Sequence, residues 1–355
     1  MRVLFLTINL ESNSTGRTYA LWLLAEAEGW DSKVVAPRGE FVWGPVSSTH
    51  FASKCVVLRD EVPEDDMELL RLAREADLMI AVKPLPGAYD RAQRLQRATG
   101  TPLLLDIDDP SLEGQIPLRN PAKFAAKAVL RARTFLPLVA LYRAARREAN
   151  VTVSNPVLQS RWGGAIVPHA RPDTGAGVAH TRSNPVVVFV GTNLAHKGVP
   201  LLRRALEQCQ EVGATLVVTD KEPADAKPWE SWVGRTTLDE GIELVKESDI
   251  VVLPSTPGLV FPEAQLPAKL IDAMIASRAV IVSDLAPLTW ALDGSGVVVN
   301  DQSAASLARA IRSLSDPRVR QELGDRARAR ALSRFTIERV RPAFREACVV
   351  AAATS

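Results

Sequence analysis

The chain has 355 residues, 46% of them hydrophobic and 24% charged, which is typical of a soluble globular protein and excludes extended disorder. Its length exceeds that of one compact domain of about 100 to 200 residues and predicts two domains. A formal net charge of only +2 gives no general reason to expect a nucleic-acid partner, and we expect none.

Two further features bear on the cellular setting. Three cysteines, far apart and odd in number, indicate reduced thiols in a cytoplasmic protein. The opening MRVLFLTINL is interrupted by polar residues too early for a signal peptide and is better interpreted as a strand. No window approaches the ~20 apolar residues that a membrane span needs.

Apolar runs of strand length alternate with helical patterns through residues 1–170. The expected strands are 3–8, 33–37, 54–58, 77–82, 102–107 and 151–154, and helical patterns cover 64–76 and 87–100. Continuous apolar strands that alternate with helices indicate a parallel sheet covered on both faces. We therefore expect an N-terminal Rossmann-like domain over residues 1–170.

The pattern breaks at residues 171–184, which are rich in Pro, Gly, Thr and Ser, and we expect the interdomain linker there. Strands then return at 185–191, 215–220, 231–234, 249–255 and 296–300, and Thr237 to Glu240 form a capping box that opens a helix. Residues 261–284 add a loop, a small-residue helix and a strand. A second doubly wound domain is expected over 185–334, followed by helix.

The segment 119–148 differs from the rest in charge. It holds eight basic residues and one acid, Glu148, interleaved with leucines and aromatic residues. A basic helix of this kind can lie on an anionic membrane surface, so the protein could be peripheral on the inner face of the plasma membrane. The alternative is a solvated helical face.

Doubly wound sheets bind ligands beyond the carboxyl ends of their strands. After the first strand, Ser14, Thr15, Gly16 and Arg17 lead into a helix whose start could bind a phosphate or part of an acceptor. Neither a dinucleotide fingerprint nor a P-loop is present. An ordinary capped turn is the alternative.

Three aspartates lie at the end of the strand expected at 102–107. Asp106 and Asp108 could orient or deprotonate an acceptor hydroxyl, or, with Asp109, hold a divalent metal against a diphosphate. We rank metal binding lowest and expect no metal site. An Asp-rich turn before Pro110 is the structural alternative.

The loop VGTNLAHKGVPLL begins with Gly191 and Thr192, and His196 and Lys197 precede the next helix. A lysine at this end of the sheet can neutralise a departing diphosphate, and Gly198 allows close approach of the backbone. A solvent-exposed lysine is the default interpretation.

The stretch FPEAQLPAKLIDAMIASRAVIVSD places Glu263, Lys269 and Asp272 around the start of a helix. The helix amides, a cation and a carboxylate one turn later could bind phosphate, sugar and ribose hydroxyls, with Gln265 and Leu266 in the adjoining loop. A surface ion pair of Lys269 with Asp272 is the alternative.

Taken in order, these segments resemble the C-terminal domain of the retaining family four of GT-B glycosyltransferases. The matching landmarks are VVVFVGTNLAHKGVPLL, WVGRTTLDEGIELVKESDIVVLPS, LPAKLIDAMIASRAVIVSD and RFTIERV, which together cover roughly residues 185 to 340. The resemblance implies two Rossmann-like domains facing a cleft. It also implies that the terminal helix, within 335–355, packs back on the first domain.

The resemblance assigns roles to matching positions. Lys197 resembles the lysine that stabilises the donor diphosphate, and Asp272 stands for the second glutamate of the family's E-x7-E motif, which binds the donor ribose. Ala264 replaces the first glutamate, with Glu263 directly before it. Thr192 stands where an arginine is common, and Lys269 could compensate for the lost charge.

These features predict a retaining glycosyltransferase that moves a sugar from a nucleotide-sugar donor to an acceptor hydroxyl. The expected acceptor is a glycan, a lipid-linked molecule or a small molecule, as in cell-envelope polysaccharide or glycolipid synthesis. The nucleotide sugar is a co-substrate, and no other cofactor is expected. Two alternatives are a sugar-nucleotide epimerase of the same fold and a degenerate binding-only subunit.

Overall fold

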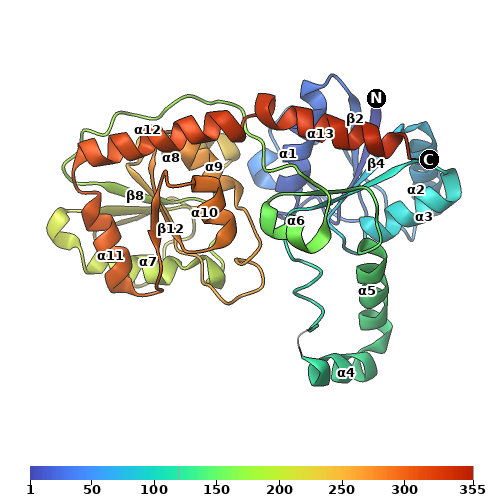
Figure 1. Ribbon diagram of the computed structural model, residues 1–355, viewed down its shortest axis with the longest axis horizontal. Coiled ribbons are helices and arrows are strands. Elements are labelled where there is room, and N and C mark those ends of the chain that lie inside the picture. Colours follow the sequence, from blue (N-terminus) through green and yellow to red (C-terminus); the bar gives the residue numbers. More distant parts are fainter. Residues whose placement is uncertain (119, 355) are drawn as a thin grey trace. The chain divides into compact units, whose positions relative to one another are not determined.

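The computed structural model of the protein describes residues 1–118 and 120–354. Arg119, the first residue of the basic segment, and Ser355 lie outside the described residues. The chain divides into two compact units, one formed by residues 1–170 with 340–355 and the other by residues 171–339. Each unit is built around a parallel sheet, which confirms the predicted α/β class (Figure 1).

The first unit holds a sheet of seven parallel strands in the order β3-β2-β1-β4-β5-β6-β7. The strands are β1 (Arg2–Leu6), β2 (Asp31–Ala36), β3 (Cys55–Val57), β4 (Leu78–Val82), β5 (Leu103–Ile107), β6 (Val151–Val153) and β7 (Ala165–Ile166). The helices of residues 1–170 are α1 (Thr15–Ala27), α2 (Pro63–Glu75), α3 (Tyr89–Thr99), α4 (Pro121–Leu130), α5 (Ala132–Ala145) and α6 (Pro156–Trp162).

The second unit holds six parallel strands in the order β10-β9-β8-β11-β12-β13. They are β8 (Val186–Phe189), β9 (Thr215–Val218), β10 (Glu230–Trp232), β11 (Ile250–Leu253), β12 (Ala279–Ser283) and β13 (Val297–Val299). The helices that begin in this unit are α7 (Val199–Glu207), α8 (Leu238–Glu247), α9 (Ala268–Ile275), α10 (Ala286–Leu292), α11 (Ala304–Ser313), α12 (Pro317–Arg334) and α13 (Ile337–Ala352). Helix α8 starts with the predicted capping box at Thr237.

The central strands are almost entirely apolar, with Asp106 of β5 and Ser283 of β12 as polar exceptions, because helices cover both faces of each sheet. Every residue of β4, β5, β11 and β12 is buried. In the second unit, one core packs α7 and α11 on one face of the sheet, and another packs α9, α10 and α12 on the other. This two-sided burial explains why no polar alternation marks these strands in the sequence.

The strand order reverses beside the first strand of each sheet, between β1 and β4 in the first unit and between β8 and β11 in the second. Loops diverge at such a switch point and leave a crevice at the carboxyl ends of the strands, where open α/β sheets bind ligands. The loops that follow β1, β4, β8 and β11 are therefore the ones to examine for function.

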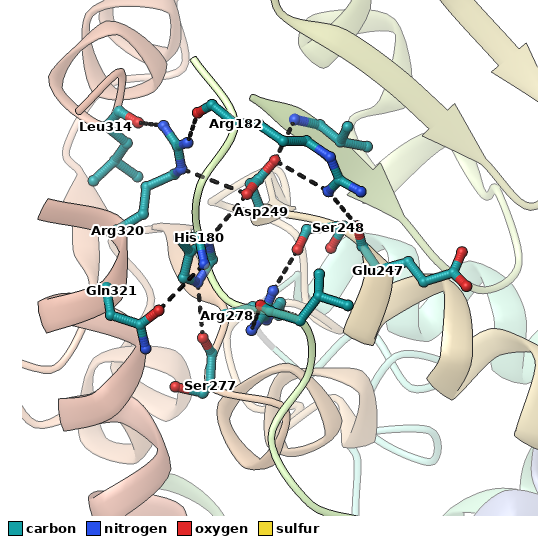
Figure 2. A network of polar contacts seen from close by, with 12 residues as sticks. His180, Arg182, Glu247, Ser248, Asp249, Ser277, Arg278, Leu314, Arg320 and Gln321 are labelled. Atoms are coloured by element: carbon teal, nitrogen blue, oxygen red, sulfur yellow. Dashed lines mark hydrogen bonds and ion pairs between the residues drawn. The ribbon is translucent and has the colours of Figure 1, made fainter. Parts of the chain in front are cut away.

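The segment 171–184, where we expected a linker, is packed within the second unit. Gly177 and Val178 donate backbone hydrogen bonds to the carbonyls of Ala276 (2.9 Å) and Lys246 (3.0 Å). Figure 2 shows His180 at the centre of a polar network, with Nδ1 3.1 Å from Asp249 Oδ1 and Nε2 3.0 Å from the carbonyl of Ser277. The segment thus belongs to the second fold unit.

Asp249 joins this network to the amino end of the sheet. Its carboxylate accepts the backbone N–H of Val186 at 2.9 Å and lies 3.7 Å from Arg320 Nε, and both charged side chains are fully buried. Burial by itself raises the pKa of Asp249, but hydrogen bonds from His180 and Val186 and the charge of Arg320 lower it below its ordinary value.

Residues 340–355 belong to the first unit although they follow the second unit in the chain. In α13, Phe344 packs on Trp30 with ring centroids 5.7 Å apart, and Arg341 donates a 3.0 Å hydrogen bond to the carbonyl of Ala27. Arg341 and Arg345 both pair with Glu28. Within the described residues, no helix has the length and apolar character to span a bilayer.

We predict that Asp249→Asn lowers the free energy of unfolding by about 3 to 5 kcal/mol at neutral pH, because it leaves Arg320 buried without its counter-charge. Urea denaturation followed by circular dichroism measures the change. Because the native pKa of Asp249 is lowered, its stabilisation is lost as pH falls through that pKa, so wild type and variant converge in acid. Asp225→Asn, which alters an exposed pair with Arg203, is the control. Equal losses in both variants would contradict the assignment.

Candidate functional site

In the second unit, the loops after β8 and β11 lie in direct contact at the switch point. Gly198 has a φ of 76°, and a Cβ there would lie 2.0 Å from the carbonyl oxygen of Pro254, so only glycine fits. The N–H of Thr256 donates to the carbonyl of His196 at 3.1 Å. These two contacts hold the His196–Lys197 loop against the end of β11.

Lys197 and Lys269 come from different segments of the chain and lie together beside the ends of β8 and β11. Lys197 Nζ donates a 3.0 Å hydrogen bond to Gln265 Oε1. Lys269, in the first turn of α9, donates to the carbonyl of Val190 at 2.9 Å, and its Nζ lies 3.7 Å from the centroid of the Phe189 ring. The structure therefore joins the two lysines that the sequence analysis identified separately.

The electrostatics of this site favour an anion. Enclosure of the ammonium group, followed by the charge of Lys197, lowers the pKa of Lys269 well below its ordinary value. Burial and then the charges of Lys197 and Lys269 lower the pKa of His196. Positive charges thus repel one another here, and a bound anion would relieve that repulsion. We name Lys197 and Lys269 the lysine pair.

Asp272 lies one turn further along α9, and its partner is Arg171 and not Lys269. Arg171 Nε donates a 2.7 Å hydrogen bond to Asp272 Oδ1, and both side chains are largely buried. The backbone of Arg171 is held as well, because it exchanges hydrogen bonds with Phe335 (3.0 Å) and Ile337 (3.1 Å). Arg171 Nη1 is buried with no hydrogen-bond partner among the described residues. The orientation of Asp272 is thus set by an anchored arginine.

Several side chains of the loop 261–267 that we expected to bind the donor make contacts within the protein. Glu263 accepts the backbone N–H of Gly258 at 2.7 Å, so its carboxylate closes a turn. Leu266 and Ala264 are fully buried, which leaves only the backbone of Leu266 for a ligand. Gln265 is half-buried and accepts the hydrogen bond from Lys197. Glu263, which we expected among the donor-binding residues, thus has one carboxylate oxygen engaged within the loop itself.

Gly191 and Thr192 are exposed at the end of β8. Gly191 donates its N–H to Thr219 Oγ1 at 2.7 Å, and a Cβ on Gly191 would lie 3.6 Å from Lys269 Nζ. That contact is an ordinary one, and the φ of 110° is the stronger reason for glycine at this position. The first amides of α9, at Ala268 and Lys269, precede any intrahelical acceptor and add donors to the same region.

In the first unit, the loop after β1 satisfies its own hydrogen bonds. The N–H groups of Thr15, Gly16 and Arg17 donate to the carbonyls of Ser12, Asn13 and Ser14, so they are not offered to a phosphate. Ser14 is buried, and its hydroxyl lies 2.5 Å from Ser12 Oγ. The predicted phosphate-binding helix start is therefore better explained as a closed turn.

Arg17 and Asp106 form a buried pair. Arg17 Nε and Nη2 lie 2.8 and 2.7 Å from the two carboxylate oxygens, and Arg17 also donates to the carbonyl of Val167 at 2.7 Å. Thr152 Oγ1 donates to Asp106 at 2.8 Å. Both charges are almost fully enclosed, which points to structural roles for these two predicted site residues.

Asp108 belongs to a second cluster, beside the carboxyl end of β4. Lys83 Nζ lies 3.1 Å from Asp108 Oδ1 and also contacts Asp109, and His169 Nε2 lies 4.0 Å from Asp108 Oδ2. Burial raises the pKa of Asp108 to about 6; Lys83 opposes this shift and Asp109 adds to it. The pKa of Asp109 is lowered instead: Lys83 and Ser111 outweigh its burial. Two adjacent carboxylates thus differ in their affinity for a proton.

The cluster is not arranged as a metal site. Within residues 1–118 and 120–354, no group of three or more His, Cys, Asp or Glu side chains is placed to hold a metal ion. Lys83 occupies the position where a cation would meet Asp108 and Asp109, and it supplies the positive charge itself.

Three residues of these sites were missed in the sequence. Lys83 directly follows an apolar strand at the switch point. A charged residue at that position could have marked it as a candidate in the sequence. The φ of 77° at Lys83 is uncommon for a residue other than glycine and marks a constrained turn. His169 lies just before the expected linker, and Arg171 is its first residue. A segment of linker composition gives no signal for individual functional side chains.

Comparison with known proteins agrees with this geometry. Residues 184–316 match the family described as Glycosyl transferases group 1. This segment contains the lysine pair, Gln265 and Asp272. No curated protein matches the chain significantly.

Solved structures match over nearly the whole chain. Sucrose-phosphate synthase from Thermosynechococcus elongatus is 16% identical with a TM-score of 0.72, and all of both chains is covered. Anabaena HepE in complex with UDP-glucose is 17% identical with a TM-score of 0.74, covering 99% of this chain and 100% of that one. WaaG, a glycosyltransferase involved in lipopolysaccharide biosynthesis, is 14% identical with a TM-score of 0.66, covering 97% of this chain and 98% of that one. The chain thus has the GT-B fold, and its residues 184–316 match the family of glycosyl transferases group 1.

Proposed function

We propose that this protein is a retaining glycosyltransferase that moves a sugar from a nucleoside diphosphate to an acceptor hydroxyl. The observation that carries the proposal is the lysine pair: Lys197, bonded to Gln265, and Lys269, bonded to the carbonyl of Val190, lie together at the β8/β11 switch point, inside the segment that matches the glycosyl transferases. A diphosphate would supply the negative charge that this place lacks. We propose a cytoplasmic location, consistent with the free cysteines at positions 55, 209 and 348.

The donor would be held by residues of the second unit alone. Lys197, Lys269 and the first amides of α9 would bind the diphosphate, whose charge increases as the bond to the sugar breaks. UDP is the first nucleotide to test, because HepE, which shares the fold, has been solved with UDP-glucose.

Asp272 would bind the donor ribose. Arg171 occupies Asp272 Oδ1, which leaves Oδ2 to accept a hydrogen bond from a ribose hydroxyl. Because the backbone of Arg171 is anchored at Phe335 and Ile337, this carboxylate would be pre-oriented before the nucleotide arrives. Arg171 is therefore proposed as a positioning residue for the donor site.

The reaction would retain the configuration of the sugar by front-face attack. The bond from the anomeric carbon to the diphosphate oxygen breaks, the acceptor oxygen bonds to that carbon on the same face, and the acceptor proton passes to the departing phosphate. Such a reaction depends on diphosphate stabilisation and on acceptor orientation more than on a strong base. Asp108, with His169 and Lys83 beside it, would orient the acceptor hydroxyl.

A binding-only subunit remains the second candidate because of a specific observation. The carboxylate of Glu263 is turned to Gly258 and Ala264 is buried, so the usual glutamate contact with the donor sugar has no obvious replacement in this loop. Nucleotide binding without sugar release, in the presence of a pool of acceptors, would favour this second reading over the transferase.

We predict that Lys197→Ala and Lys269→Met each weaken UDP binding by about 10- to 100-fold, because each removes a charge-assisted contact with the diphosphate. Isothermal titration calorimetry measures the affinity. Lys221→Ala, an exposed lysine of the same unit, is the control and should bind as wild type does. If UDP binds all four proteins equally well, the lysine pair is not the diphosphate site.

We predict that Arg171→Gln and Asp272→Asn each weaken UDP binding by about tenfold. The first leaves the Asp272 carboxylate without the arginine that orients it, and the second replaces the carboxylate with a neutral amide, which is a weaker acceptor for the ribose hydroxyl. The sharper readout is discrimination: wild type should bind UDP better than 2′,3′-dideoxy-UDP, and both variants should bind the two alike. Arg328→Gln, which alters the pair with Asp173 in the same unit, is the control. Undiminished discrimination in Arg171→Gln would refute the positioning role.

We predict that Asp108→Asn lowers kcat of sugar transfer by about 100-fold while UDP affinity stays unchanged, because its partners lie in the first unit. The wild-type rate should decline as pH falls below about 6, where Asp108 becomes protonated and stops accepting a hydrogen bond from the acceptor hydroxyl. The variant should lose this acidic limb. An unaltered pH profile in Asp108→Asn would mean that another group titrates.

A further inference from the structure

Helix α4 presents its apolar side chains to solvent. Ala122, Ala125, Ala126, Val129 and Leu130 are all exposed, and their spacing of three, four, seven and eight positions places them on one face of the helix. Val129 and Leu130 are 78% and 81% exposed. A surface helix normally turns such a face toward the core, so α4 is oriented the opposite way.

The orientation of α4 is fixed by its other face. Phe124 and Ala128 pack against the small core of Leu112, Phe135 and neighbouring residues, and the rings of Phe124 and Phe135 meet edge to face at 5.1 Å. Asn120 caps the helix by accepting the N–H of Lys123 at 2.9 Å. Lys127 donates to the carbonyl of Gln115 at 2.8 Å. The helix therefore cannot roll its apolar face inward without losing these contacts.

Basic residues adjoin the apolar face, and acidic residues are absent from this part of the sequence. Residues 120–147 contain seven Lys or Arg and no Asp or Glu. Lys123, Arg131 and Arg133 are exposed on α4 and at the turn into α5. Within the first unit, α4 and α5 extend away from the sheet, so α4 lies at the far end of a projecting hairpin (Figure 1).

We propose that this outward face of α4 docks on an anionic phospholipid bilayer. Apolar side chains next to basic ones suit the boundary between acyl chains and anionic headgroups, where the apolar groups enter the bilayer and the cations pair with phosphates. A second copy of the chain is a poorer partner, because pairing two α4 faces would bring two sets of like charges together. Charge complementarity therefore selects the anionic membrane.

The docking surface also bears on the class of acceptor, and this inference about the acceptor rests on the proposed function. A transferase held at a membrane meets acceptors whose hydroxyl group is carried on a lipid. Of the acceptor classes considered above, the lipid-linked class is then the one that α4 favours. Membrane binding itself requires no turnover and can be tested separately.

The test is co-sedimentation of the full chain with vesicles of phosphatidylcholine alone or mixed with phosphatidylglycerol. Wild type should pellet with the anionic vesicles and stay in solution with the neutral ones. The charge variant Lys123→Gln/Arg131→Gln/Arg133→Gln should lose about 100-fold in partitioning, since each basic residue near the surface contributes about fivefold. The apolar variant Val129→Ser/Leu130→Ser should lose about tenfold or more.

Matched controls lie elsewhere in the chain. Val349→Ser/Val350→Ser alters two exposed apolar residues of α13, and Lys221→Gln/Arg309→Gln/Arg318→Gln removes three exposed charges of the second unit. Both should pellet as wild type does. UDP binding and the circular dichroism spectrum show that every variant is folded. The proposal is overturned if wild type ignores the anionic lipid, if neutral vesicles bind it equally, or if the α4 variants bind like the controls.

Discussion

The enclosure of one lysine beside another at the end of a parallel sheet is the constraint on which this account depends. Lys269 is enclosed against an aromatic ring and a carbonyl, and the charge of Lys197 lowers its pKa further. Such an arrangement costs stability in the empty protein, and an anion that enters it recovers that cost. We therefore propose that this site binds a negatively charged ligand.

Backbone constraints keep the two lysines together. Gly198 lets the loop after β8 approach Pro254 at the end of β11, and Gly191 adopts a φ of 110° beside Lys269. On the far side of the same sheet, the His180–Asp249–Arg320 network secures the segment that enters the unit. The buried network lies at the amino ends of the strands and the proposed ligand site at their carboxyl ends. Substitutions in one should therefore have little effect on the other.

Much of the fold could be predicted from the sequence, because buried parallel strands are continuous apolar runs and the capping box at Thr237 is a local signal. Strand β7 was missed since two residues carry no period. The lysines and Asp272 could be selected because they sit at recognisable positions, but their partners could not. Arg171 pairs with a residue 101 positions away, and Arg17 with one 89 positions away. Sequence spacing carries no information about such pairs, and for this reason Arg17 and Asp106 were first assigned to ligands.

The most direct test of the central claim is proton uptake on UDP binding. Because an anion would raise the lowered pKa of Lys269, binding should draw protons from solution in mildly alkaline buffer, where UDP itself is already fully ionised. Calorimetric titration in buffers of different ionisation enthalpy should show this uptake for wild type and none for Lys269→Met. Binding without uptake, or equal uptake by both proteins, would contradict the account.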